Sequence, residues 1–271
     1  MGAGGGWLKR ASRQSEDIEL GQREQAREQG VLVFAFPSRS VRCVTHLNVN
    51  AAQCAGGLLR SEGAPMKLFV LPGSCALACH IALEWADAAY ELELLGHDAL
   101  RSERFLAVNP KAKVPALVLD GEDVITEAHA ILLFIADLFP DARLAPAASD
   151  LVRRAKLNET LSELTSEVHP AFGPLFAPSR YAAEPGCEEA VKRAAHARVD
   201  ACFVRLDAAL GGKDWLLGER SIADPYLYAL SRWLRMTPKP VESYPAIARH
   251  YARMASDPYV CRALEAEGLA A

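Results

Sequence analysis

Residues 66–80 of the chain read MKLFVLPGSCALACH. This stretch predicts a short apolar strand, a Pro-Gly turn and then a helix that begins at Cys75. The unpaired N–H groups at a helix start and the positive end of the helix dipole both favour an anion. Near neutral pH, Cys75 is therefore expected to be a thiolate or to hold one. It is the first candidate functional residue of the chain.

Composition and charge narrow the class of protein. The 271 residues leave room for one or two domains with a sizeable core. Apolar residues make up 51% and charged residues 24%, as is usual for a globular protein. The formal net charge of -4 shows no basic bias. Because phosphate binding needs clustered Lys and Arg, no nucleic-acid partner is expected.

The cysteines indicate a reducing compartment. There are seven, an odd number scattered along the chain, and they form no CxxC pair and no tight Cys/His cluster typical of a zinc site. We therefore expect a cytoplasmic protein without a metal. The longest early apolar run, residues 31–36, is far shorter than the ~20 residues of a membrane span, so no membrane association is expected.

The first 65 residues differ from the rest of the chain. Residues 2–6 are nearly all glycine, residues 8–30 are rich in Arg, Gln and Glu, and residues 31–65 show no sustained period. We expect residues 1–65 to be a poorly ordered extension. Met66 stands immediately before the first clean strand, so an over-long gene start is one explanation of this segment. A targeting or regulatory arm is the other.

From Met66 the hydrophobic pattern becomes regular. The order is strand, helix, strand, then two strands and a helix, which indicates a thioredoxin-like half over residues 66–145. The strands are predicted at 67–71, 90–95, 114–119 and 123–126, and the helices at 75–88 and 127–139.

After a Pro- and Ala-rich linker, residues 150–271 show helical periodicity and no convincing strand. The predicted fold is an α/β thioredoxin-like domain followed by an all-α helical bundle. In the second half, Ser221 and Asp224 have the spacing of a helix-capping pair, so Asp224 is expected to be buried. Trp215 and Trp233 are interpreted as core. The helices are predicted at 150–172, 188–210, 221–234 and 246–255.

This domain order, with a cysteine at the first helix start, resembles the cytosolic glutathione S-transferases. Several segments in the right order are similar to the bacterial beta class of that family, and together they cover residues 66–271. They are residues 67–80, the loop AVNPKAKVPAL at 107–117, TEA at 126–128, the segment from EVH at 167–169 to FGPLF at 172–176, and EAEGL at 265–269.

The resemblance implies a glutathione site on the thioredoxin-like half. Pro115 is cis in the family, and the backbone of Val114 would pair with glutathione as an added strand. Glu127 would bind the ammonium of the γ-glutamyl group, and the backbone N–H of Ala128 would hold its carboxylate. Alternatives from the residues alone are that Pro115 only starts a strand and that Glu127 only caps a helix.

The resemblance also implies contacts around the sulfur. His169 would lie beside Cys75 and help to hold or create the thiolate, although a lone histidine on a helix is more often structural. Ser162 stands where relatives often have an asparagine that contacts glutathione. Arg101 is the candidate for the glycine carboxylate, in a loop that differs in length. Pro170 stands where relatives often have lysine.

His80 is interpreted as core or as support for the site. The function implied is attack of the glutathione thiolate on a small hydrophobic electrophile, with thiol–disulfide exchange through a mixed disulfide on Cys75 as a further step. The electrophile would bind near Ala171, Phe172 and residues 174–181, and the family implies a homodimer. Alternatives are another glutathione-dependent enzyme (an etherase, dehalogenase or isomerase) and a non-enzymatic binding protein on the same fold.

Overall fold

The computed structural model describes residues 32–35, 41–44, 66–119 and 123–269. The chain divides into two units, residues 1–61 and residues 62–271. In the first unit, β1 (Leu32–Ala35) pairs antiparallel with β2 (Val41–Val44). No strand was predicted in this segment, but both stretches are rich in the apolar and β-branched residues that favour strands. The rest of the predicted poorly ordered extension lies outside the described residues.

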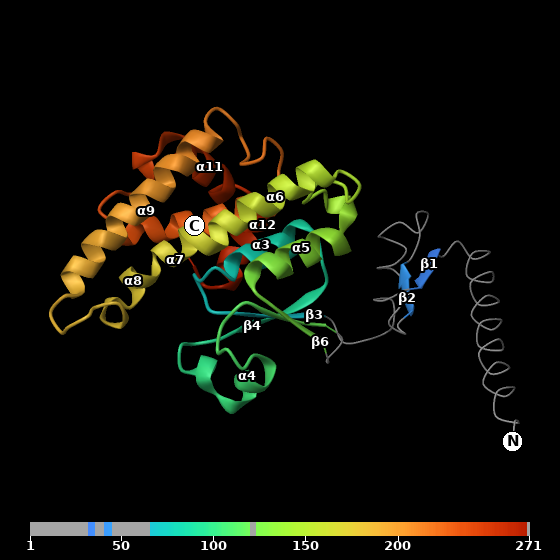
Figure 1. Ribbon diagram of the computed structural model, residues 1–271, viewed down its shortest axis with the longest axis horizontal. Helices are drawn as coiled ribbons and strands as arrows, with labels where there is room; N and C mark the ends of the chain where they lie inside the picture. The colour runs from blue at the N-terminus through green and yellow to red at the C-terminus, as the bar shows by residue number, and fades with distance from the viewer. Residues whose placement is uncertain (1–31, 36–40, 45–65, 120–122, 270–271) are drawn as a thin grey trace, which may run out of the picture. The chain divides into compact units, whose positions relative to one another are not determined.

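The second unit is built on a four-stranded sheet in the order β4-β3-β5-β6 (Figure 1). β3 (Met66–Val70) pairs parallel with β4 (Tyr90–Leu94) and antiparallel with β5 (Ala116–Leu119). β5 in turn pairs antiparallel with β6 (Asp123–Thr126). A parallel pair needs a crossover, and α3 (Leu77–Trp85) provides it between β3 and β4. The predicted order of strands and helices is confirmed.

The two faces of the sheet carry different cores. Successive side chains of a strand point to opposite faces, so Leu68 belongs to the main core and Phe69 to a smaller cluster. The main core contains α3 and α5 (Ala128–Leu138), while the smaller cluster lies under α4 (Glu103–Val108), on the other side of the sheet (Figure 1). The hydroxyl of Ser102 caps α4 by accepting from the Phe105 N–H at 3.3 Å.

The second half is helical, and no strand follows β6 in the described residues up to 269. Its predicted helix over 150–172 is interrupted by a π-helical turn, and the short helix α8 and the last helix α12 were not predicted. Helix α12 does carry a recognisable start signal, because Asp257 caps it and Pro258 is its first residue. The helices are α6 (Leu151–Glu163), the π turn η3 (Leu164–Val168), α7 (His169–Ala171), α8 (Gly173–Phe176), α9 (Glu188–Leu210), α10 (Ala223–Ser231), the 3₁₀ turn η5 (Arg232–Met236), α11 (Pro245–Ala255) and α12 (Pro258–Ala266).

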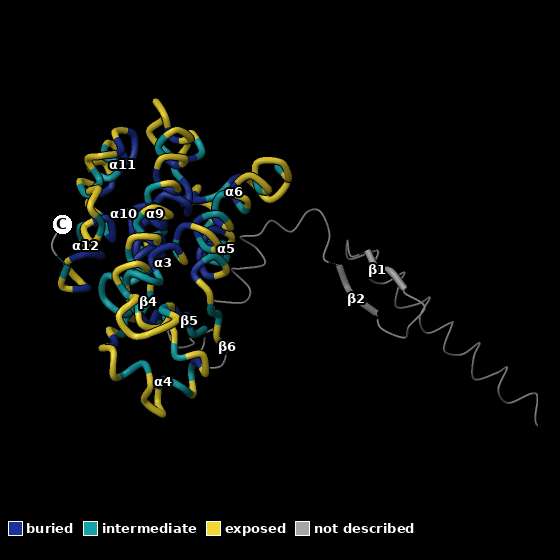
Figure 2. Tube along the Cα trace, turned by 60° about the vertical axis from the view of Figure 1, so that its left-hand side comes forward, coloured by how far each residue is buried: buried dark blue, intermediate teal, exposed yellow. Residues whose placement is uncertain are grey.

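Helix α3 lies at the centre of the second unit. It packs against α5 on one side and against α10 and α12 on the others, and every one of its residues except Glu84 is buried (Figure 2). A helix that is apolar on all sides is stable only when it is surrounded. The start of α3, where the candidate cysteine lies, is therefore held by elements of both halves.

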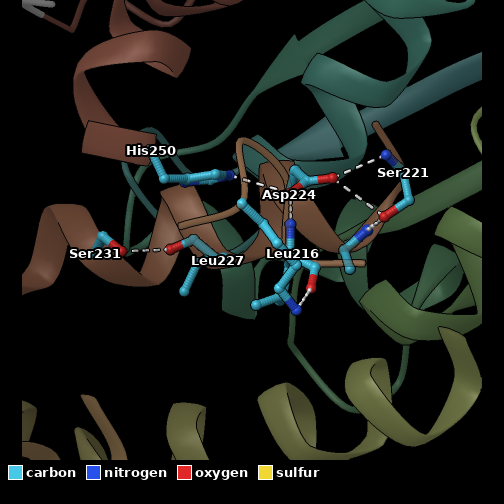
Figure 3. Close-up of polar contacts among 8 residues, drawn as sticks. Leu216, Ser221, Asp224, Leu227, Ser231 and His250 are labelled. Carbon is cyan, nitrogen blue, oxygen red and sulfur yellow. Dashed lines mark hydrogen bonds and ion pairs between the residues drawn. The ribbon is translucent and has the colours of Figure 1, made fainter. Parts of the chain in front are cut away.

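A buried carboxylate organises the helical half around α10 (Figure 3). Asp224 accepts hydrogen bonds from the Ser221 N–H at 2.8 Å, the Ser221 hydroxyl at 3.1 Å, the Leu216 N–H at 2.9 Å and His250 Nε2 at 3.1 Å. The predicted burial of Asp224 is confirmed. The helix begins one residue later than the capping pattern implies, at Ala223, whose N–H donates to the Ser221 hydroxyl.

Replacing Asp224 should destabilise the fold strongly. The Asp224→Ala change leaves the buried donors of Ser221, Leu216 and His250 without an acceptor, and breaking such a network costs about 3–5 kcal/mol of unfolding free energy. The measurement is urea-induced unfolding followed by circular dichroism.

Asp214→Ala is the matched control, because Asp214 is an exposed carboxylate that pairs with Arg253 at the surface. An exposed pair contributes about 0–1 kcal/mol. Equal losses of stability in the two variants would show that the buried network is not what holds this region.

Candidate functional site

The loop before α3 places Cys75 just ahead of the helix. The chain leaves β3, turns through Gly73 with φ of 76°, and the N–H of Ser74 donates to the Leu71 carbonyl at 3.0 Å. The helix begins at Leu77, two residues later than predicted, and the N–H of Ala78 donates to the Cys75 carbonyl at 3.1 Å. Cys75 therefore belongs to the tight turn that leads into α3.

Side chains from the helical half hold this loop. The N–H of Gly73 donates to Glu267 Oε2 at 3.1 Å, and the Gly73 carbonyl accepts from the indole of Trp233 at 2.9 Å. The other oxygen of Glu267 lies 2.9 Å from Nδ1 of His80 on α3. Glu267 and His80 are buried, and the expectation that His80 belongs to the core is confirmed.

The environment of Cys75 opposes the thiolate. Burial raises the pKa of the Cys75 thiol to about 12, and the carboxylate of Glu127 adds to the rise, while a local backbone hydrogen bond and the ammonium of Lys113 oppose it. Of the two expectations for Cys75, that it is a thiolate or that it holds one, this environment favours the second, because removal from water outweighs the helix start. A neutral thiol remains a donor that can hold an anion.

A second cysteine, Cys79, packs on α3 one helical turn after Cys75. Cys79 is buried on α3, and its thiol lies 3.7 Å from the carbonyl of Ala128 at the start of α5. Burial raises the pKa of the Cys79 thiol well above its ordinary range. Cys79 is therefore a packing residue between α3 and α5 in this structure.

The segment before β5 presents a free stretch of backbone. The Val114–Pro115 bond is cis, and β5 begins at Ala116, two residues later than predicted. Asn109 is buried and fixes the loop by donating to the Lys113 carbonyl at 2.6 Å. Within the described part of the chain, the N–H and C=O of Val114 take part in no hydrogen bond. They are free to pair with an extended peptide.

Glu127 does not cap α5 with its side chain. Its backbone has a φ of 72°, a strained conformation for a residue other than glycine, and no cap hydrogen bond is formed. The exposed carboxylate instead accepts from the Lys111 ammonium at 2.7 Å. Ala128 follows as the first residue of the helix, and it is buried. The Glu127 side chain therefore forms no cap hydrogen bond, and its carboxylate is paired with an amine cation.

His169 follows the π turn η3 and lies among aromatic rings. Its Nδ1 is 2.9 Å from the Tyr226 hydroxyl, and its ring centroid is 5.0 Å from that of Trp233. Burial and the ammonium of Lys113 both lower the pKa of His169. A neutral imidazole is therefore favoured. Trp233 connects His169 to the Gly73 loop.

Ser162 and Arg101, which were also predicted to contact glutathione, have no described contact with the other site residues. Ser162 is exposed on α6, and Thr165 and Ser166 donate to its carbonyl, at 3.2 and 2.7 Å. Arg101 is exposed in η1 (Ala99–Arg101), beside α4 and the smaller core cluster. The described contacts of Cys75, Glu127 and His169 include neither residue.

Residues missed by sequence reasoning complete the site. Tyr226, Trp233 and Lys113 act on Cys75 or His169, and Glu267 holds the Gly73 loop. None of the four had a role assigned beyond core or motif. The available signals were EAEGL at 265–269, which contains Glu267, and AVNPKAKVPAL at 107–117, which contains Lys113. An aromatic surface adjoins His169: the ring of Phe176 is 52% exposed and meets Trp233 edge-on at 5.0 Å.

The described residues contain neither a cluster suited to a metal nor a helix suited to a membrane span. No cluster of three or more His, Cys, Asp or Glu side chains there is arranged to hold a metal ion. None of the helices that the structure describes has the length and apolar character needed to cross a membrane.

The sequence matches two domain families. Residues 73–138 match the glutathione S-transferase N-terminal domain, and residues 165–258 match the glutathione S-transferase C-terminal domain. The chain is also 37% identical over 209 residues to the glutathione S-transferase GstA of Escherichia coli O157:H7, covering 75% of this chain and 100% of the relative.

Solved structures show the same likeness. A bacterial beta class glutathione S-transferase from Sphingomonas chungbukensis is 41% identical, with a TM-score of 0.68 over 75% of this chain and all of that one. A sphingomonad glutathione S-transferase complexed with glutathione has the same identity, coverage and TM-score.

The raised pKa of Cys75 predicts slow alkylation. In the free protein at pH 7, iodoacetamide should modify Cys75 at least about a hundredfold more slowly than the exposed Cys187, since only a thiolate reacts. Peptide mapping by mass spectrometry after timed quenching measures both rates in one sample.

The rate at Cys75 should still be rising at pH 9, because the thiolate fraction grows until the pKa is reached. Modification of Cys75 at pH 7 as fast as that of Cys187 would show that burial does not suppress ionisation of the Cys75 thiol.

Proposed function

The chain belongs to the glutathione S-transferase family, and from this we propose that it joins the sulfur of glutathione to small hydrophobic electrophiles. The observation that carries the proposal is the convergence of three features at one end of the sheet. These are the thiol turn at Cys75, the unpaired backbone of Val114 and the exposed carboxylate of Glu127, which follow or precede the strand ends that the register brings together. Each suits a different part of a tripeptide with a thiol, an amide backbone and a free amine.

In the proposed complex, glutathione extends along Val114 and Pro115. The backbone N–H and C=O of Val114 pair with the peptide as a strand would. Glu127 binds the γ-glutamyl ammonium, and its present contact with the Lys111 ammonium supports that preference. The N–H of Ala128 is among the unpaired donors of a helix start, so it suits the neighbouring carboxylate. Ser162 would contribute a hydroxyl from the facing helix.

The sulfur of glutathione would lie between Cys75 and His169. Because burial keeps Cys75 a neutral thiol, its S–H donates to the glutathione thiolate and orients it. A mixed disulfide on Cys75 remains the second chemistry proposed for the site. Intact mass before and after reduction, with oxidised glutathione supplied, distinguishes the two. An adduct in the wild type that Cys75→Ala lacks would establish the covalent role.

The electrophile would bind on the aromatic side of His169. Phe172 and Ala171 are buried there, whereas Phe176 is half exposed over Trp233. Edge-to-face aromatic contacts of this kind contribute about 0.5–1.5 kcal/mol each, so an aromatic substrate suits the surface.

We also propose a cytoplasmic homodimer. None of the five cysteines at positions 75, 79, 187, 202 and 261 forms a disulfide, which suits a reducing compartment. Leu151 and Val152 at the start of α6 are 75% and 73% exposed, an unusual state for neighbouring apolar residues that a second copy would relieve. Analytical ultracentrifugation of the purified protein tests the oligomeric state.

Glutathione binding and turnover test the proposal directly. We expect saturable binding by titration calorimetry and conjugation of chlorodinitrobenzene. Glu127→Gln should raise the KM for glutathione about tenfold or more, because a charge-assisted hydrogen bond of about 1.5–3 kcal/mol is lost.

The matched control is Glu159→Gln, because Glu159 is an exposed carboxylate that also pairs with a lysine, at 2.6 Å, but on α6. Binding of glutathione without turnover of any electrophile would favour the alternative of a binding protein. Turnover restricted to an ether, a halide or an isomerisable substrate would favour another enzyme on this fold.

Lys113, in place of Arg101, is the cation that we propose for the glycine carboxylate. It precedes Val114, its charge acts on both Cys75 and His169, and no hydrogen bond or ion pair engages its ammonium among the described side chains. Lys113→Gln should raise the KM for glutathione about tenfold, while Arg101→Gln should leave it unchanged. The reverse result would return the role to Arg101.

A further inference from the structure

The hydroxyl of Tyr226 and the imidazole of His169 form an isolated pair. Tyr226 lies on α10 with 1% of its surface exposed, and its oxygen is 2.9 Å from His169 Nδ1. In the described residues the Tyr226 hydroxyl has no other hydrogen-bond partner. The two rings meet nearly edge-on, with centroids 6.3 Å apart. The direction of this one hydrogen bond therefore decides the proton arrangement of the pair.

A count of donors and acceptors gives that direction. A neutral imidazole has one N–H and one bare nitrogen, and a tyrosine hydroxyl both donates and accepts. If Tyr226 donates to Nδ1, its buried hydrogen is satisfied. If Nδ1–H donates to Tyr226 instead, the hydroxyl hydrogen is left without an acceptor inside the protein, at a cost of about 1–3 kcal/mol. The first arrangement is favoured.

The surroundings of the pair favour a neutral His169 ring and a protonated Tyr226 hydroxyl. The titratable groups that act on His169 are the Tyr226 hydroxyl on α10 and the Lys113 ammonium before β5. Lys113 and burial lower the pKa of His169, which favours the neutral ring. Burial raises the pKa of Tyr226 far above neutrality, so its O–H stays available as a donor.

We propose that Tyr226 is a positioning residue that holds His169 as the Nε2–H tautomer, so that His169 donates a hydrogen bond to the glutathione sulfur and does not take the thiol proton. This rests on the proposed function, which places the sulfur beside His169. In the step, the S–H bond of glutathione breaks, the proton passes to water, and the electron pair stays on sulfur as the thiolate. Nε2–H then stabilises that thiolate together with the Cys75 thiol.

The tautomer is measurable without substrate. NMR of protein with isotopically labelled histidine reports which ring nitrogen of each histidine carries hydrogen, and His169→Asn identifies the signals of His169. We expect a protonated Nε2 and a bare, hydrogen-bonded Nδ1 in the wild type, and a mixture of tautomers in Tyr226→Phe. A protonated Nδ1 in the wild type would overturn the proposal, whether or not the variant folds.

Tyr228→Phe is the matched control. Tyr228 is also buried on α10, but its hydroxyl accepts from Arg232 at 3.2 Å and its ring packs against Tyr251. This variant should leave the His169 signals unchanged. A change in them equal to that of Tyr226→Phe would mean that the effect is a general disturbance of α10.

A second readout follows the thiol itself. The ultraviolet absorbance of the thiolate gives the pKa of bound glutathione, which should rise by about one unit in Tyr226→Phe and stay constant in Tyr228→Phe. An unchanged pKa of bound glutathione in Tyr226→Phe would also overturn the proposal. If glutathione does not bind at all, the proposed function fails, while the tautomer in the free protein still decides the role of Tyr226.

Discussion

The carboxylate of Glu267 is the group on which the geometry of the site depends. It lies beyond α12 near the end of the described chain, yet it accepts from the Gly73 N–H and contacts His80 on α3. A buried carboxylate costs several kcal/mol unless its oxygens are hydrogen-bonded, so both contacts are needed for it to stay there. The Gly73 carbonyl is held by Trp233. Both backbone groups of Gly73 are thus bound by side chains of the helical half.

This arrangement explains why the thiol beside that glycine behaves differently from a cysteine at an open helix start. The dipole of a helix contributes about 0.3–1 kcal/mol to a nearby anion. The rise in the pKa of Cys75 to about 12 corresponds to about 4 kcal/mol against the thiolate. Desolvation therefore exceeds the dipole severalfold. The same packing that fixes the position of Cys75 makes it a hydrogen-bond donor in the free protein.

On the other side of the proposed sulfur position, the π turn η3 and the helices around it determine where His169 lies. The hydroxyls of Thr165 and Ser166 donate to the Leu161 and Ser162 carbonyls, at 2.9 and 2.7 Å, bonds that bend helices. A π turn changes the direction of the side chains that follow, and such turns are frequent at functional sites. His169 is the next residue, and its ring contacts the Tyr226 hydroxyl and the Trp233 indole. Small rearrangements here would therefore move His169 and the neighbouring aromatic rings together.

Local patterns in the chain were enough to predict the order of strands and helices, the buried Asp224 and the turn that carries Cys75. Hydrophobic periodicity and helix capping involve residues that are close in sequence, so they can be recognised without a structure. The contacts that set the chemistry join distant residues: Gly73 and Glu267 are 194 positions apart, and Gly73 and Trp233 are 160 apart. No local pattern encodes which side chains surround a thiol or an imidazole. The protonation states of Cys75 and His169 therefore follow from burial and from distant partners, which appear when the chain is folded.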